Sequence, residues 1–498
     1  MARITPITVF NRIVLPILGR YGGTTFWKQN LALRRAARLP LEERRRMQLE
    51  RLNALLKEAA VSVPLYRDRL AGTRAAQGLA DLEQLRELPI TTKEDLQSGF
   101  PDRVVHAQAD RRTWQYVSSS GTVSRVVTVK DFDRRDQERA SLLHTLRAGS
   151  GYRPGLPIVQ IPANICNLMC GVDATNEDES FRREMGRYVW GKLRRSSPDI
   201  SNLRGAFDRR LIFRSRMLNP LCTVGTQVEA DRLREYWERI RAERPYLVQA
   251  LPEYLYLLAE WARAEGKPPL GASCYLPMGA GACGYVRRRI ERGLGGRFLD
   301  YYGTAELGPV AFESAPGEGM RPVLEHFVLE IERDGRPCAP GEMGMLLITD
   351  LNNRAMPFIR YEVGDLAMGA DAPPGAQDAS PRLRVVGRPD QVLPGRDGDL
   401  IRPDALQDHL VEQAGLLAFS LRERRSGRLQ IDYVPAAASV DGARVVETLR
   451  ALVGDGPVIK ARQVRNIAPE TSGKFRFIQC ERRLWSGRAE PVDGRAAG

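Results

Sequence analysis

Six residues in the middle of the chain, Gly279-Ala280-Gly281-Ala282-Cys283-Gly284, have the spacing of a dinucleotide-binding loop. Such a loop lets the backbone approach a pyrophosphate at the start of a helix. An acidic residue, Asp300, follows at the end of the next expected strand, where a ribose hydroxyl would need an acceptor. The spacing allows an NAD-dependent dehydrogenase. It is equally typical of a tight turn that packs a helix against a strand.

A second loop is rich in hydroxyl groups. It runs through Ser118-Ser119-Ser120-Gly121-Thr122 and continues to Arg125. Hydroxyl and backbone N–H donors that converge in such a turn form a nest for an anion such as phosphate. A solvated serine-rich turn remains the alternative.

Other common signatures are missing from the sequence. Gly473-Lys474 is not a Walker A motif, because no glycine stands five residues before Gly473 and Phe475 follows the lysine. The seven cysteines form no CxxC pair and no Cys/His metal spacing. We therefore expect a reduced, cytoplasmic protein.

The elements that must position these loops alternate between strands and helices, which predicts an α/β fold. Helices are expected at 41–60, 131–148, 230–242, 252–266 and 285–293, and strands at 114–117, 126–129, 274–278, 297–301, 323–332 and 344–349. After Gly387 the pattern restarts, with elements expected at 391–401, 405–414, 428–434 and 443–453.

Composition narrows the class of protein. The 498 residues are 43% hydrophobic and 27% charged, which excludes collagen-like, disulfide-scaffold and disordered chains. The formal net charge is +14, and only eight of the 75 basic residues are lysines. Without a basic block or a basic–aromatic stripe, we expect a solvated surface rather than a nucleic-acid-binding one. The apolar N-terminal stretch is too short to span a membrane.

Five motifs stand in a fixed order along the chain. They are Ser119-Ser120-Gly121-Thr122, Asp300-Tyr301-Tyr302-Gly303-Thr304-Ala305-Glu306, Arg360-Tyr361-Glu362-Val363-Gly364-Asp365, Gly387-Arg388-Pro389-Asp390 and Pro469-Glu470-Thr471-Ser472-Gly473-Lys474. This set resembles the adenylate-forming superfamily of acyl-CoA synthetases. It is most similar to the phenylacetate–CoA ligase group and its capsule-biosynthesis-associated relatives. The likeness runs from about residue 40 to 480.

The resemblance implies an ATP site. It assigns the phosphates to Ser119, Ser120, Gly121 and Thr122, and it places Gly303 and Thr304 in the same site. It also implies that Tyr302 stacks on adenine, Asp300 accepts from the adenine amine, Asp365 accepts from the ribose hydroxyls and Arg388 contacts the nucleotide. The loop at Gly279–Gly284 would then line the adenine and acyl pocket, which explains its glycines without NAD.

Catalytic roles are implied for two residues. Glu306 would hold Mg²⁺, and Lys474 would bridge the substrate carboxylate and the α-phosphate. Asp390 matches the hinge about which a small domain rotates to admit a thiol. Three residues depart from the usual phosphate loop and one from the magnesium motif: Val123, Ser124, Val126 and Ala305.

We therefore expect a large nucleotide- and acyl-binding domain at 1–387, with a helical extension at 1–60, and a small mobile α+β cap at 388–498. The expected function is ATP- and Mg²⁺-dependent activation of a small carboxylic acid, followed by transfer to coenzyme A. An amide synthetase or an AMP-transferase with a non-CoA acceptor is the alternative, and a dehydrogenase is a distant one. Neither a nucleic-acid partner nor a transmembrane segment is expected, and a homodimer is left open.

Overall fold

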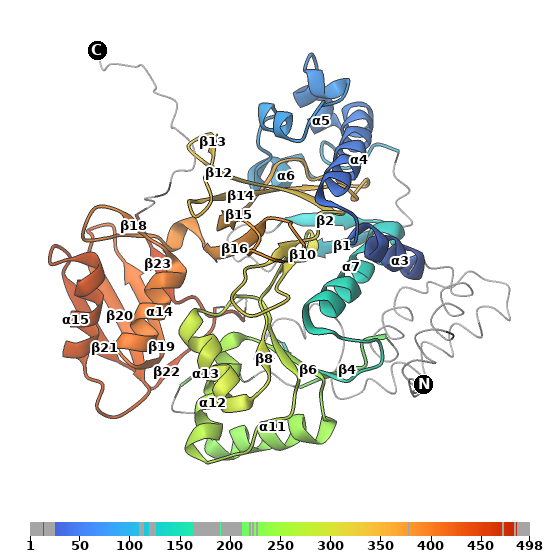
Figure 1. The fold of residues 1–498 in the computed structure, drawn as a ribbon. Coiled ribbons are helices and arrows are strands. Elements are labelled where there is room, and N and C mark those ends of the chain that lie inside the picture. Colours follow the sequence, from blue (N-terminus) through green and yellow to red (C-terminus); the bar gives the residue numbers. More distant parts are fainter. Residues whose placement is uncertain are drawn as a thin grey trace, which may run out of the picture.

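In the computed structural model, the chain folds into several β-sheets, some parallel and some antiparallel, with helices packed around them (Figure 1). The structure describes residues 13, 25–108, 114–118, 126–162, 190, 212–218, 221, 224–225, 228–376, 378–470, 473–482 and 485. Helices and strands alternate through most of these ranges, so the predicted α/β class is confirmed.

One sheet is parallel, in the order β4-β3-β6-β7-β8. Its strands are Ser215–Met217, Ile158–Ile161, Leu247–Ala250, Cys274–Pro277 and Arg297–Phe298. The connecting helices are α11 (Ala230–Glu243), α12 (Pro252–Ala264) and α13 (Gly284–Leu294). The inner strands β3, β6 and β7 are short and mostly apolar because a parallel sheet is covered on both faces. The carboxyl ends of β6 and β7 meet at one edge, where the Gly279–Gly284 loop begins.

A second sheet is antiparallel, in the order β13-β12-β14-β15-β16. Its strands are Arg336–Pro337, Phe327–Arg333, Met343–Asp350, Tyr361–Ala370 and Arg382–Gly387. The long helix α4 (Leu41–Ser62) is tied to this sheet, since Gln48 Nε2 donates to the Phe327 carbonyl at 2.7 Å. Arg44 forms a buried ion pair with Glu325 at 2.9 Å. The amphipathic pattern at 41–60 therefore predicted a helix correctly.

The strand expected at 297–301 is wrong as a single element. The chain leaves the parallel sheet after β8 and enters a separate sheet, β11-β10-β9, whose strands are Arg321–Pro322, Gly308–Phe312 and Tyr301–Thr304. Asp300 stands at this break, and its own carboxylate accepts from the Tyr301 N–H at 2.9 Å. A local pattern cannot show which sheet continues a strand.

The residues after 400 form a further sheet, β21-β20-β19-β23, drawn in orange and red in Figure 1. Its strands are Ile459–Gln463, Leu429–Pro435, Leu416–Glu423 and Ile478–Cys480, and it carries helices α14 (Pro403–Gln413) and α15 (Gly442–Val453). Its buried apolar side chains are continuous with those of α12 and α13. Ahead of these sheets the chain also forms α3 (Phe26–Ala36), β1 (Gln115–Ser118), β2 (Val127–Lys130) and α7 (Phe132–Ser150).

Within the described ranges, no helix combines the length and the apolar character needed to cross a membrane. Cys274, Cys283, Cys338 and Cys480 are free thiols.

Helices α12 and α13 approach closely at Gly293. A Cβ there would lie 2.7 Å from the Ala259 carbonyl oxygen and 2.8 Å from the Ala259 Cβ. We expect Gly293→Ala to lower the free energy of unfolding by about 1–2 kcal/mol, although alanine is up to about 1 kcal/mol better inside a helix. Urea unfolding measures this. Gly456→Ala, where no described atom lies within 4 Å, is the control, and equal effects of the two changes would contradict the expectation.

Candidate active site

A cleft of about 1250 Å³ opens at the carboxyl ends of β6 and β7. Its walls come from the Gly279–Gly284 loop, from β9 and the turn after it, from β15 and β16, and from residues around 474. The structure brings together there nine of the residues singled out from the sequence: Asp300, Tyr302, Gly303, Thr304, Glu306, Asp365, Arg388, Asp390 and Lys474.

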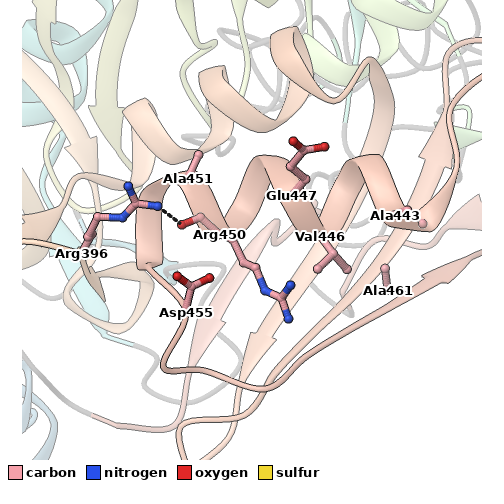
Figure 2. A pocket seen from close by; sticks show the side chains of 9 residues that line it. Arg396, Ala443, Val446, Glu447, Arg450, Ala451, Asp455 and Ala461 are labelled. Carbon is pink, nitrogen blue, oxygen red and sulfur yellow. Dashed lines mark hydrogen bonds between the residues drawn. The ribbon is translucent and has the colours of Figure 1, made fainter.

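A second hollow, of about 670 Å³, lies between α15 and β21 (Figure 2). Arg396 donates to the Arg450 carbonyl at its rim. Its charged side chains Glu447, Arg450 and Asp455 are exposed to solvent. The candidate site therefore lies in the larger cleft.

Asp365 lies between two donors. The Tyr302 hydroxyl donates to Asp365 Oδ2 at 2.7 Å, and Arg388 Nε donates to Asp365 Oδ1 at 3.1 Å. Burial and the adjacent Asp365 carboxylate raise the pKa of Tyr302, which keeps its proton in this bond. The carboxylate has further lone pairs and can accept from a diol. The arrangement thus presents an anchored acceptor with a cation beside it.

Lys474 reaches the same cleft from the C-terminal part of the chain. Its Cε lies 3.1 Å from the position that a Cβ on Gly279 would occupy, so a side chain there would crowd it. Burial and Arg388 lower the pKa of Lys474, while Asp365 and Glu306 raise it. The next residue, Phe475, is buried against Tyr254 of α12, with 5.9 Å between the ring centroids. This contact fixes the loop that carries the lysine.

Glu306 sits in a turn that two buried cations hold. Lys130 Nζ donates to the Ala305 carbonyl at 2.8 Å, and Arg134 donates to the Leu307 carbonyl at 2.6 Å. Lys130 also pairs with Glu138 at 2.7 Å. Arg134 pairs with the fully buried Asp350 at 2.9 Å.

Sequence reasoning missed these two cations. The available signal was a lysine at the end of the short apolar strand β2, followed by Arg134 and Glu138 four residues apart on a helix. That spacing alone is also typical of a surface ion pair.

Asp300 is half-buried beside another carboxylate, that of Glu313. Burial and the neighbouring Glu313 raise the pKa of Asp300 to about 6, and Arg287 opposes them. Arg287 in turn holds Glu313 with bonds of 2.6 and 3.2 Å. The Asp300 carboxylate oxygens lie 3.6 Å from the position that a Cβ on Gly281 would occupy. Because residue 281 is glycine, no side chain stands between these oxygens and the cleft.

Asp390 is tied to the lysine loop. Its carboxylate pairs with Arg476, which also reaches Glu470 at 3.4 Å. Glu470 N–H in turn donates to the Lys474 carbonyl at 2.9 Å. Asp390, the residue expected at a hinge, is therefore ion-paired with a residue that stands two positions after Lys474.

The loop expected to hold phosphate, Ser119, Ser120, Gly121 and Thr122, lies outside the described residues, as do Val123 and Ser124. Its ends pair as an antiparallel hairpin, with Ser118 of β1 opposite Val127 of β2. Thr304 Oγ1 accepts from the Leu307 N–H at 3.2 Å. Gly303 allows close strand contact, since a Cβ there would lie 2.6 Å from the Gly308 carbonyl oxygen.

A magnesium ion fits the donor set at Glu306. Across the described residues, no three His, Cys, Asp or Glu side chains gather in a cluster that could hold a metal. Glu306 instead offers one largely buried carboxylate on the cleft wall. One carboxylate suits Mg²⁺, which keeps water ligands and takes others from nucleotide phosphates.

Comparisons with known proteins confirm the predicted resemblance, although no protein-family model matches. The chain is 29% identical over 405 residues to phenylacetate-coenzyme A ligase of Escherichia coli (strain K12), covering 78% of this chain and 81% of the relative. It is 28% identical over 359 residues to the enzyme of that name from Pseudomonas putida, covering 70% and 71%.

Solved structures show the fold of adenylate-forming CoA ligases. A 2-hydroxyisobutyryl-CoA ligase in the postadenylation state matches with a TM-score of 0.67 at 21% identity, covering 90% of this chain and 92% of that one. The same ligase in the thioesterification state, with acyl-AMP and CoA, gives a TM-score of 0.54.

The Lys130–Glu138 pair should contribute strongly to stability. We expect Lys130→Met to lower the free energy of unfolding by about 2–4 kcal/mol, because it leaves Glu138 and the Ala305 carbonyl without their donor. The double variant Lys130→Met/Glu138→Gln should lose less than the sum of the two single losses. Additive losses in urea unfolding would contradict the pairing.

Asp300 should make stability depend on pH. Its pKa of about 6 in the folded chain is above the ordinary 3.8, so the folded state binds more protons between these values. Stability from this group is then lost as pH rises from about 4 to 6. As pH rises across this range, the free energy of unfolding of Asp300→Asn should increase relative to that of the wild type by up to about 2–3 kcal/mol. Urea unfolding without ligand measures this difference. A constant difference would contradict the shift.

Proposed function

We propose that this relative of the phenylacetate–CoA ligases activates a small carboxylic acid with ATP and transfers the acyl group to coenzyme A. One observation carries the proposal: Lys474, from the C-terminal part of the chain, is half-buried in the cleft close to Arg388, Asp365 and Glu306. A cation among these groups suits a reaction between two anions.

The first step joins the acid to the nucleotide. A carboxylate oxygen attacks the α-phosphorus of ATP, the bond to the bridging oxygen of the β-phosphate breaks, and pyrophosphate leaves. The Lys474 ammonium group neutralises charge on the carboxylate and the α-phosphate as they meet. Asp365 accepts from the ribose hydroxyls, and Arg388 holds Asp365 in place. When bound, Mg²⁺ would be held by Glu306 and would neutralise charge on the phosphates.

The second step forms the thioester. The CoA sulfur, having lost its proton to solvent, attacks the acyl carbon, the bond from that carbon to the AMP oxygen breaks, and AMP leaves. We propose that the part after residue 387 turns about Asp390 between the steps, which withdraws Lys474. The Asp390–Arg476 ion pair and the Phe475–Tyr254 contact support this, because both hold the first-step arrangement. We place the reaction in the cytoplasm, and a homodimer stays a prediction.

Lys474→Ala should lower carboxylate-dependent ATP–pyrophosphate exchange at least about 100-fold, since it removes charge stabilisation from the transition state. Lys460→Ala, at an exposed position of β21, is the matched control and should retain exchange. The measurement uses a panel of aryl, arylacetic, fatty and amino acids, and thermal unfolding verifies that both variants fold. Equal exchange in the two variants would overturn the role of Lys474. CoA-dependent AMP release over the same panel tests the acceptor.

A further inference from the structure

Glu253 lines the cleft as a buried carboxyl group that the mechanism does not use. It is the second residue of α12, and its side chain is only 7% exposed. Among the described residues, nothing forms a hydrogen bond with its Oε2. Burial raises the pKa of Glu253 to about 7, opposed only by its own backbone N–H.

The surroundings of Glu253 place it next to the lysine loop on the β6 side. Met278 N–H donates to the Ala250 carbonyl at 2.8 Å, which joins the end of β6 to Gly279. Gly279 faces Lys474, and Tyr254, directly after Glu253, packs on Phe475. The Tyr254–Phe475 contact thus brings the start of α12 beside the loop that carries Lys474.

The nucleotide side of the cleft carries different groups. Arg388, Asp365 and Glu306 all act on the pKa of Lys474, yet none of these groups acts on that of Glu253. Glu253 therefore lies away from the ionic end of the cleft, where the acyl part of the acid remains to be held. Gln249, on the adjoining β6, adds an amide to the same wall, and its Oε1 accepts from Gln160 at 2.9 Å.

An acid at a helix start is commonly explained by the helix dipole. That role is met by an exposed carboxylate and gives no reason to bury one with an unpaired oxygen. A buried polar atom without a partner destabilises the folded chain, and a ligand group that supplies the hydrogen bond recovers that free energy.

We propose that Glu253 selects the substrate acid, and that this acid carries a hydroxyl or amino group in its acyl part. The donor on the substrate would bond to Glu253 Oε2, with the Gln249 amide as a second polar contact. This assignment rests on the proposed function, since it names the class of acid that the ligase activates.

Carboxylate-dependent ATP–pyrophosphate exchange with matched pairs of acids tests it. Each pair matches an acid that bears a donor with the analogue that has a methyl group in its place. We match 4-hydroxy- and 4-aminophenylacetate each with 4-methylphenylacetate, 4-hydroxybenzoate with 4-methylbenzoate, and 6-hydroxyhexanoate with heptanoate. In at least one framework we expect the wild type to favour the donor-bearing acid at least about tenfold, because a site built to bond a donor rejects an analogue that lacks one. Glu253→Met should abolish that preference. Glu253→Gln keeps the shape and should weaken it.

Glu265→Met, at the exposed far end of the same helix, is the control and should retain the wild-type preference. Because burying Oε2 without a partner is unfavourable, the Glu253 variants should unfold at or above the wild-type temperature. If acids support exchange but the Glu253 variants show the same preferences among them as the wild type, the role of Glu253 in selecting the acid is overturned and the proposed function is not. If no acid supports exchange in the wild type, the proposed function fails and the assignment falls with it.

Discussion

The partial burial of Lys474, in a cleft whose other walls come from residues far ahead of it in the chain, is the feature on which the rest of the site depends. A lysine is stable in such a place only where nearby carboxylates compensate for lost water. Asp365 and Glu306 supply that compensation, and Phe475 holds the loop through Tyr254.

Buried arginines explain part of the basic composition. Arg134 joins α7 to Asp350, and Arg44 joins α4 to Glu325 and Asp378. Arg360, in a left-handed backbone conformation, pairs with Glu330 and Glu332 and also donates to the Leu88 carbonyl. Its rigid fork of donors lets one guanidinium group join several distant segments. These arginines therefore form ion pairs inside the fold, and their charge does not indicate nucleic-acid binding.

The glycine-rich loop illustrates how one spacing serves different ligands. The Gly279–Gly284 segment does follow a parallel strand and precede a helix, as a dinucleotide loop does. Here it faces Lys474 through Gly279 and Asp300 through Gly281. Both kinds of site need backbone that a ligand can approach closely, and only glycine provides it without a Cβ.

The sequence by itself determined the α/β class, most helices and the order of the motifs, and it singled out nine residues that the structure brings together in the cleft. The class and the helices follow from local periodicity. The cleft residues follow from the resemblance of the ordered motifs to the adenylate-forming superfamily. Only the tertiary structure decided that the chain changes sheets at Asp300, that Lys130 and Arg134 hold the Glu306 turn, and that Glu253 is buried without a partner. The reason is physical. Each of these depends on contacts between segments remote in sequence, and burial and pairing of a charge become visible only when those segments meet.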